Sequence, residues 1–189
     1  MKKLEYPIKT ERLILRPLQM SDLHDLLLYY SMEIVTRFLY IEPKNIEEME
    51  DSLQSKIRHT SLQEKGDKLT LAVVLPEENR VIGEVSLFLK KPEHNTAEIG
   101  YVFNPDYHGH GYASEAAGMM LKIGFQHYNF HRIFARCDAR NIASYKVMER
   151  LGMRREAHLI QNEFVKGEWT DELEYAILKD EWLKNHSNE

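Results

Sequence analysis

The stretch "NPDYHGHGYASEAAGMM", residues 104–120, constrains the fold more than any other part of the sequence. It places a proline and two glycines, Gly109 and Gly111, directly before a run of helix-forming residues. Glycine lets successive backbone N–H groups turn toward one point, and the first turn of a helix carries a partial positive charge. This order of residues predicts a short loop, a helix that begins near Gly111, and an anion bound at their junction.

The residues around the glycines do not fit two common nucleotide-binding loops. A P-loop has Lys and then Ser or Thr directly after its last glycine, where this chain has Tyr112 and Ala113. A dinucleotide-binding loop has a third glycine, where this chain has Ser114. Two interpretations remain: a pyrophosphate bound by backbone N–H groups alone, or a tight turn between strand and helix with no ligand.

The segment after the loop has the strongest helical periodicity in the chain. Its apolar residues recur at steps of three and four, so one face should lie on a sheet. They are Ala113, Ala116, Ala117, Met120, Leu121, Gly124, Phe125 and Tyr128.

Strand patterns surround this helix. The runs "LTLAVVL", "VIGEVSLFL" and "TAEIGYVF" are separated by short polar connections, which predicts an antiparallel meander. After the helix come a strand in "HRIFARCD", a helix in "NIASYKVMERLGM" ended by Gly152, and two strands joined near Lys166 and Gly167. The strand–helix–strand unit from Ile99 to Asp138 requires a parallel pair. We therefore expect an α+β fold with a mixed, mostly antiparallel central sheet flanked by helices.

The N-terminal part adds one strand and two helices. "RLILRP" predicts a strand closed by Pro17, and "SDLHDLLLYY" predicts a helix with Ser21 as its N-cap. A surface helix with a narrow apolar stripe is expected from Asn45 to about Lys65. The chain has 189 residues, which suits a single domain over residues 1–189.

Composition excludes several classes of partner. A net charge of −5 argues against a nucleic-acid binder, which usually needs a basic excess. No apolar run approaches the roughly 20 residues of a membrane span, and the N-terminus lacks the apolar stretch of a signal peptide, so we expect a cytoplasmic protein without membrane partners. The single cysteine, Cys137, cannot form an internal disulfide and is expected to share the inward face of its strand as an inert thiol.

The glycine loop and its surroundings resemble a known family. "AEIGYVFNPDYHGHGYASEA" and "NIASYKVMERLGM" resemble the acetyl-CoA motif of the GNAT acetyltransferases. "TERLILRPLQMSD" and "EWTDELEYAILKDEW" resemble the branch that contains the RimJ/RimL ribosomal-protein N-terminal acetyltransferases and the spermidine acetyltransferases. The resemblance implies the GNAT fold, acetyl-CoA as co-substrate and an amine as acceptor.

It also implies a set of coenzyme-binding residues. Backbone groups of Tyr101, Val102 and Phe103 would hold the pantetheine arm, on a strand that diverges from its neighbour. The residues that would surround the pyrophosphate are His108, Gly109, His110, Gly111, Tyr112, Ala113 and Ser114. The segment from Asn141 to Arg150, with Asn141, Ser144 and Lys146, would complete the site.

Several of these positions have a second interpretation. His110 and Lys146 are either positive neighbours of phosphate or solvated surface residues. The family loop often has Gln or Arg where this chain has Asp106, so we expect Asp106 to face solvent or cap the turn. His108 and His110 flank Gly109 without a paired carboxylate or cysteine, and we assign no metal site.

Ser144 is the candidate acid. It falls on the apolar stripe of its helix with Val147, Met148 and Leu151, where a hydroxyl needs a partner. It could bond to the backbone, and Asn141 could be only an N-cap. In the spermidine-type relatives a tyrosine at the position of Met148 often protonates the leaving thiolate; the RimL-like relatives use the serine that matches Ser144.

A carboxylate is the natural base, because an amine must lose a proton before or during attack. Glu163 matches the base position of the RimL-like relatives. Glu98 is the second choice, and both Glu98 and Glu84 also suit cross-strand pairing.

Two functions of different classes follow. The first is an acetyl-CoA-dependent N-acetyltransferase that acts on a protein N-terminus, an amino acid, a polyamine or another amine-bearing small molecule. The second is a catalytically silent acyl-CoA-binding sensor or subunit. The assembly is expected to be a monomer or a homodimer.

Overall fold

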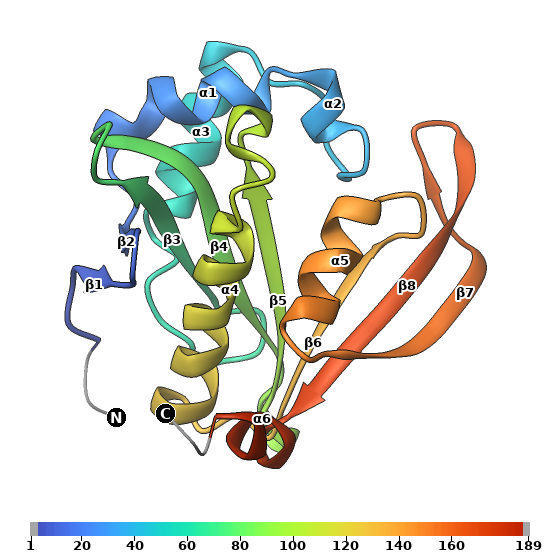
Figure 1. Ribbon diagram of the computed structural model, residues 1–189. Helices are drawn as coiled ribbons and strands as arrows, with labels where there is room; N and C mark the ends of the chain where they lie inside the picture. Colours follow the sequence, from blue (N-terminus) through green and yellow to red (C-terminus); the bar gives the residue numbers. More distant parts are fainter. Residues whose placement is uncertain (1–3, 187–189) are drawn as a thin grey trace.

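The computed structural model describes residues 4–186 and contains a mixed eight-stranded sheet in the order β1-β2-β3-β4-β5-β6-β8-β7 (Figure 1). Its strands are β1 (Ile8–Lys9), β2 (Ile14–Pro17), β3 (Lys68–Leu75), β4 (Arg80–Lys91), β5 (Thr96–Phe103), β6 (Arg132–Asp138), β7 (Arg154–Val165) and β8 (Glu168–Leu178). Each neighbouring pair is antiparallel except β5 and β6, which run parallel. The expected α+β fold, with its meander and its parallel unit, is confirmed.

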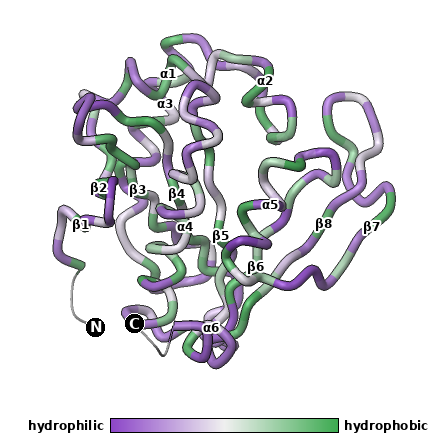
Figure 2. The backbone as a smooth tube through the Cα atoms, in the orientation of Figure 1, coloured by the Kyte–Doolittle hydropathy of each residue, from purple (hydrophilic) through white to green (hydrophobic). Residues whose placement is uncertain are grey.

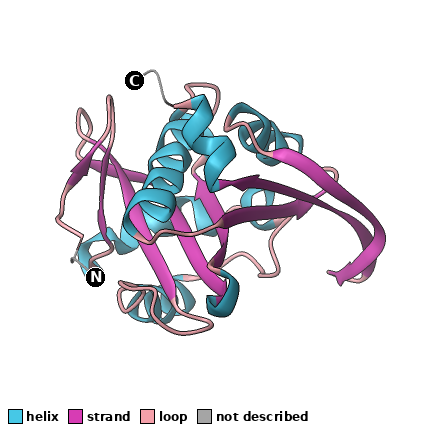
Figure 3. Cartoon of the chain, turned by 90° about the horizontal axis from the view of Figure 1, so that it is seen from below, coloured by secondary structure: helices cyan, strands magenta, loops and turns pink. Residues whose placement is uncertain are grey.

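Helices cover both faces of this sheet (Figure 3). They are α1 (Leu23–Tyr30), α2 (Glu33–Thr36), α3 (Ile46–Lys56), α4 (Tyr112–Lys122), α5 (Ile142–Arg150) and α6 (Lys179–Asn185). Among residues 4–186, no helix has the length and apolar character needed to cross a membrane.

The two faces carry separate cores. Leu26 of α1 and Met49 of α3 are fully buried against one face, with Ala72 of β3. Met120 of α4 and Leu87 of β4 are fully buried on the other face. Hydrophobic residues accordingly colour the central strands and the inward side of α4 (Figure 2). Burying this much apolar surface is the main driving force for the fold.

The central helix follows its sequence pattern. Gly111 is its N-cap, and Ala116, Ala117, Met120 and Leu121 are buried. The helix continues into a π-helical turn over Ile123–His127 before β6 begins. Gly152 ends α5 with φ of 75°, and the β7–β8 turn lies at Lys166 and Gly167. These predictions are confirmed.

Three local predictions need correction. Ser21 is not an N-cap: it lies inside a 3₁₀ turn over Met20–Asp22, and the Asp22 carboxylate accepts the Gln19 N–H at 2.8 Å. Helix α3 ends at Lys56 rather than near Lys65, because the chain then turns so that Thr60 can pair with Leu69 of β3. The short elements β1, α2 and α6 were not expected, since two to seven residues are too few to show a period.

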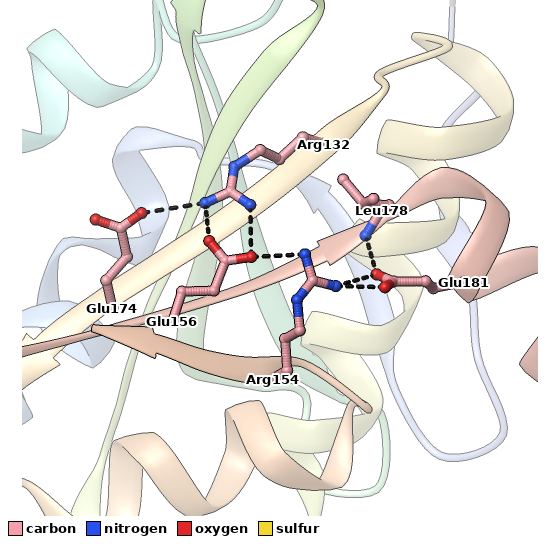
Figure 4. Close-up of polar contacts among 6 residues, drawn as sticks. All are labelled: Arg132, Arg154, Glu156, Glu174, Leu178 and Glu181. Carbon is pink, nitrogen blue, oxygen red and sulfur yellow. Dashed lines mark hydrogen bonds and ion pairs between the residues drawn. The ribbon is translucent and has the colours of Figure 1, made fainter. Parts of the chain in front are cut away.

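An ionic network joins the last three strands to α6 (Figure 4). Arg132 of β6 binds Glu156 of β7 at 3.0 and 2.6 Å and Glu174 of β8 at 3.1 Å. Arg154 binds Glu156 at 2.6 Å and also pairs with Glu181 of α6. A connected set of charges of this kind holds position better than isolated surface pairs do.

Candidate active site

Strands β5 and β6 part company near their middle. Parallel pairing joins Thr96 to Arg132, Ala97 to Ile133 and Glu98 to Phe134, and it stops there. Beyond Glu98 the two strands diverge, and α5 lies beside the opening (Figure 1). Backbone groups of β5 that point away from β4 therefore have no strand partner over residues 99–103.

The glycine loop lies at the end of β5. Gly109 and Gly111 have φ of 83° and 81°, a conformation that residues with a side chain adopt only under strain. No atom lies within 4 Å of the position that a Gly109 Cβ would occupy, so the loop presents bare backbone to its surroundings. Asp106 is exposed, as expected, and the turn is capped by the side chain of Asn104, which accepts the Asp106 N–H at 3.1 Å.

A cleft of about 800 Å³ runs between this loop, β5 and α5. Of the lining residues, thirteen are the ones that the family resemblance assigns to the coenzyme: Tyr101, Val102, Phe103, His108, Gly109, His110, Gly111, Tyr112, Ala113, Ser114, Asn141, Ser144 and Lys146. Segments that lie about 40 residues apart in sequence are thus brought to one surface. The Ser114 Oγ is buried and has no hydrogen-bond partner among the described residues.

The cations near the loop differ in availability. Lys146 pairs with Glu149 of the same helix at 2.9 Å. Arg150 also lines the cleft, is exposed, and forms no ion pair within residues 4–186. His110 stacks on Tyr112, with 5.6 Å between ring centroids.

Arg12, which the sequence analysis did not single out, holds the loop from the far end of the sheet. Its guanidinium donates to the His110 carbonyl at 2.9 Å and pairs with Glu115 in the first turn of α4 at 2.7 Å. Thr10 donates a further hydrogen bond to Glu115 at 2.6 Å. Burial raises the pKa of Glu115, but the hydrogen bonds from Thr10 and Arg12 outweigh this effect, and the pKa is lowered overall. A negative charge near the anion-binding loop is thereby neutralised.

Asn141 and Ser144 begin α5. The Asn141 side chain accepts the Ser144 N–H at 3.1 Å, so Asn141 is the N-cap. The Ser144 hydroxyl donates to the Tyr101 hydroxyl at 3.3 Å, and the Tyr101 hydroxyl donates to the Ser144 carbonyl at 2.8 Å. Ser144 thus bonds across the cleft to β5 rather than back along its own helix.

Cys137 lies next to this pair and is half-buried, while Ile133 and Ala135 on the same face of β6 are fully buried. Burial raises the pKa of the Cys137 thiol to about 11, although a hydrogen bond with Ser144 opposes the shift. The thiol is therefore protonated near neutral pH, as an inert cysteine would be.

A segment around α2 forms the opposite wall of the cleft. Its lining side chains are Ile34, Val35, Phe38 and Leu39. Val35 and Leu39 also pack against the core that α1 and α3 share. This apolar wall was not predicted, because the segment has no regular period.

The two glutamates assigned as bases lie outside the residues that line the cleft. Glu163 is half-buried on β7 opposite Thr170, and its carboxylate forms no ion pair or hydrogen bond within residues 4–186. Glu98 pairs with Lys90 at 2.7 Å and with Arg136 at 3.2 Å. Two cations thus hold Glu98, whereas Glu163 is unengaged.

A third carboxylate, Glu172 on β8, was missed. It is 5% exposed, and its contacts are long: 3.3 Å to Asn162, 3.4 Å to Arg136 and 3.5 Å to the Tyr40 hydroxyl. Burial raises the pKa of Glu172; Glu163 and Glu98 raise it further, and Arg136 lowers it. The alternation of β8 contained the signal, since Glu172 lies on the face opposite Leu173 and Tyr175.

Glu84 of β4 has a different environment. Its Oε1 accepts hydrogen bonds from the Tyr30 hydroxyl at 2.9 Å and from Lys56 at 2.6 Å. Its Oε2 is buried and has no partner among the described residues. Glu84 lies opposite Val102, which lines the cleft.

Comparison with known proteins decides the family. The family described as "Acetyltransferase (GNAT) domain" matches residues 12–154. The chain belongs to the GNAT acetyltransferases. It is 39% identical to the uncharacterized N-acetyltransferase YnaD of Bacillus subtilis, over 93% of this chain and 98% of that protein. The family assignment drawn from the loop and helix motifs is thereby confirmed, and this GNAT protein is an N-acetyltransferase.

Solved structures agree with the fold. A GNAT-family acetyltransferase from Bacillus anthracis superposes with a TM-score of 0.82 at 36% identity, covering 93% of this chain and all of that one (100%). RimL, the ribosomal L7/L12 α-N-protein acetyltransferase solved with coenzyme A, superposes with a TM-score of 0.77 at 21% identity, covering 89% and 95% of the two chains. At that identity the likeness to RimL concerns the fold alone.

Proposed function

We propose that this GNAT enzyme transfers the acetyl group of acetyl-CoA to a primary amine. The observation that carries the proposal is the cleft between β5 and α5, which is lined by all thirteen residues that the family resemblance assigns to the coenzyme. Bare backbone at Gly109 and Gly111, the start of α4, the unpartnered Ser114 hydroxyl and the unpaired Arg150 are features that suit a pyrophosphate.

Acetyl-CoA supplies a thioester carbonyl that a neutral amine can attack. In this proposal Glu163 takes the amine proton, directly or through a water molecule, because its carboxylate is unengaged. The Ser144 hydroxyl, held by Tyr101 on the cleft wall, gives a proton to the leaving sulfur. Met148 at the position of the spermidine-type tyrosine has no proton to give.

Further charges near Glu163 favour a cationic acceptor. Glu172 and Glu98 lie on the same face of the sheet as Glu163 and both raise the pKa of Glu172, so the local potential there is negative. An amine in its ammonium form would be drawn to this face before it loses its proton. We also propose a cytoplasmic location, a single domain over residues 1–189, and a monomer or homodimer.

Thiol release from acetyl-CoA in the presence of a panel of amines tests the function. The panel contains N-terminal peptides, amino acids and polyamines. We expect release of free thiol above the rate of spontaneous hydrolysis with at least one class of amine. A protein that acetyl-CoA stabilises against heat, but that releases no thiol with any amine, would instead be a silent acyl-CoA binder.

A further inference from the structure

A second hollow lies away from the coenzyme cleft, between α3 and the start of β3. It has a volume of about 540 Å³ and shares no lining residue with the cleft. Its lining residues are Lys44, Glu48, Asp51, Ser52, Ser55, Lys56, His59 and Lys68. We propose that this hollow binds a small anion with two or more negative charges, either a phosphate group or a polycarboxylate.

The positive charges in the hollow are incompletely paired. Within residues 4–186, neither Lys44 nor Lys68 forms an ion pair; the Lys68 ammonium lies 5.4 Å from the centre of the Phe88 ring. Lys56 pairs with Glu84 at 2.6 Å. The cations also act on one another: burial lowers the pKa of His59, and Lys68 and Lys56 lower it further. An anion would relieve this repulsion.

The two acidic residues of the hollow do not cancel these charges. Glu48 accepts the Asn45 N–H at 3.0 Å as part of the capping box that begins α3. Asp51 is exposed and forms no ion pair among the described residues. Three lysines and a histidine therefore face two carboxylates, one of which is committed to the start of a helix. The local balance is positive in a chain whose net charge is −5.

One face of α3 supplies the remaining donors. Ser52, Lys56 and His59 follow one another at steps of four and three, so they lie on one side of the helix. The Ser52 and Ser55 hydroxyls have no hydrogen-bond partner among the described residues and can donate to an oxygen. Lysine binds phosphate and carboxylate as a point charge, without the planar geometry that arginine imposes. Ligands with several charged oxygens therefore fit better than a monovalent ion.

The hollow is connected to the cleft through Lys56. The Glu84 carboxylate that Lys56 binds lies opposite Val102, which lines the cleft. An anion in the hollow would give Lys56 a second negative partner in addition to Glu84. The proposal does not depend on the acceptor or on catalysis, since it concerns binding to residues outside the cleft.

A phosphate titration of the full chain tests the proposal. Inorganic phosphate is added at constant ionic strength, with chloride as the balancing ion, and backbone amide shifts are followed by NMR and heats by calorimetry. We expect saturable shifts at residues 52–59 and 68. The Lys44→Gln/Lys68→Gln double variant should weaken binding at least about tenfold. The matched variant Lys122→Gln/Lys184→Gln removes two exposed lysines elsewhere and should bind as the parent does.

The outcomes separate cleanly. Shifts confined to residues 108–114 would mean that phosphate binds the glycine loop alone, and the proposal would be wrong. The same holds for an equal loss in both double variants, or for no saturation with phosphate or citrate. Citrate in a parallel titration distinguishes the ligand classes: saturation by phosphate alone identifies a phosphate site, and saturation by citrate alone identifies a polycarboxylate site. If the Lys44/Lys68 variant does not fold, the map of shifts on the parent decides the question.

Discussion

Lys166, in the turn between β7 and β8, donates a hydrogen bond from its ammonium group to the main-chain carbonyl of Thr36 at 3.1 Å. Thr36 is fully buried at the end of α2, and Lys166 also lies 3.5 Å from the Glu42 carboxylate. These contacts fasten the segment 33–42, which forms one wall of the cleft, to a hairpin 130 residues further along the chain.

Removal of this contact should impair binding of the acceptor. Lys166→Met keeps the apolar stem but loses the donor, so the segment 33–42 is less well held. We expect the KM for the amine to rise about three- to tenfold, with little change in the KM for acetyl-CoA. Lys65→Met, at an exposed turn, is the matched control. Unchanged amine kinetics would show that the segment holds its position without Lys166.

Glu115 should affect coenzyme binding although it is a negative residue. Glu115→Gln weakens the contacts with Arg12 and Thr10 that fix the start of α4. We expect the KM for acetyl-CoA to rise roughly three- to tenfold, with turnover at saturation close to that of the parent. Glu93→Gln, an exposed residue outside the cleft, controls for charge. A lower KM would mean that the Glu115 charge repels the coenzyme more than its contacts help.

The glycine loop should be intolerant of side chains. Acetyl-CoA should stabilise the parent against heat, by about 2.7 kcal/mol at a hundredfold excess over Kd. Gly109→Val/Gly111→Val should remove this stabilisation, because valine is strained at positive φ and blocks approach to the backbone. Gly66→Val is a matched control, since Gly66 has φ of 94° and lies in a turn away from the cleft. Equal stabilisation of both variants by acetyl-CoA would contradict the loop assignment.

Acid–base catalysis gives a fourth prediction. Glu163→Gln should lower turnover by about 10²–10⁴-fold with little effect on coenzyme affinity, and the rate should then rise with pH toward the pKa of the free amine. Ser144→Ala should cost less, because a thiolate leaves readily. Glu77→Gln, on an exposed turn, should behave as the parent. If Glu163→Gln keeps the parental turnover and pH profile, Glu98 or a chain of water molecules takes the proton.

The ionic network of Figure 4 should make stability depend on acid. The hydrogen bond from Arg132 lowers the pKa of Glu156 from its ordinary value of 4.5, against the effect of burial. A carboxylate with a lowered pKa stabilises the folded state above pH 4.5, and the stabilisation is lost as pH falls through the lower value. Urea unfolding should show Glu156→Gln to be less stable by about 1 kcal/mol at pH 7, with the difference shrinking toward pH 3. A constant difference across this range would assign the effect to packing rather than to charge.

Sequence patterns predicted the parts of the fold that follow local rules. The loop, α4 and the meander depend on glycine, capping and periodicity within short windows, and each was found in its expected place. Ser21 shows where such rules end: its neighbour Asp22 satisfies the backbone better because it also binds Arg16 at 2.7 Å. The competition between two caps one residue apart depends on a contact with another strand.

Residues missed at the site depend on distant parts of the chain. Arg12 reaches Glu115 across 103 positions, and Glu172 meets Tyr40 across 132. No local pattern distinguishes these side chains from ordinary surface charges. The pairing of strands brings them to the cleft, and that pairing becomes visible only when the order of β6, β8 and β7 is known.

Three residue pairs between β5 and β6 have a mechanical consequence. They act as a hinge, with β6, β7, β8 and α5 as a lever on one side and the rest of the sheet on the other. A small rotation at the hinge becomes a wide movement at the far end, where Lys166 holds Thr36 like a latch. A molecule that bridges both arms would stiffen the lever, so the protein should be most compliant when the cleft is empty and the latch is released.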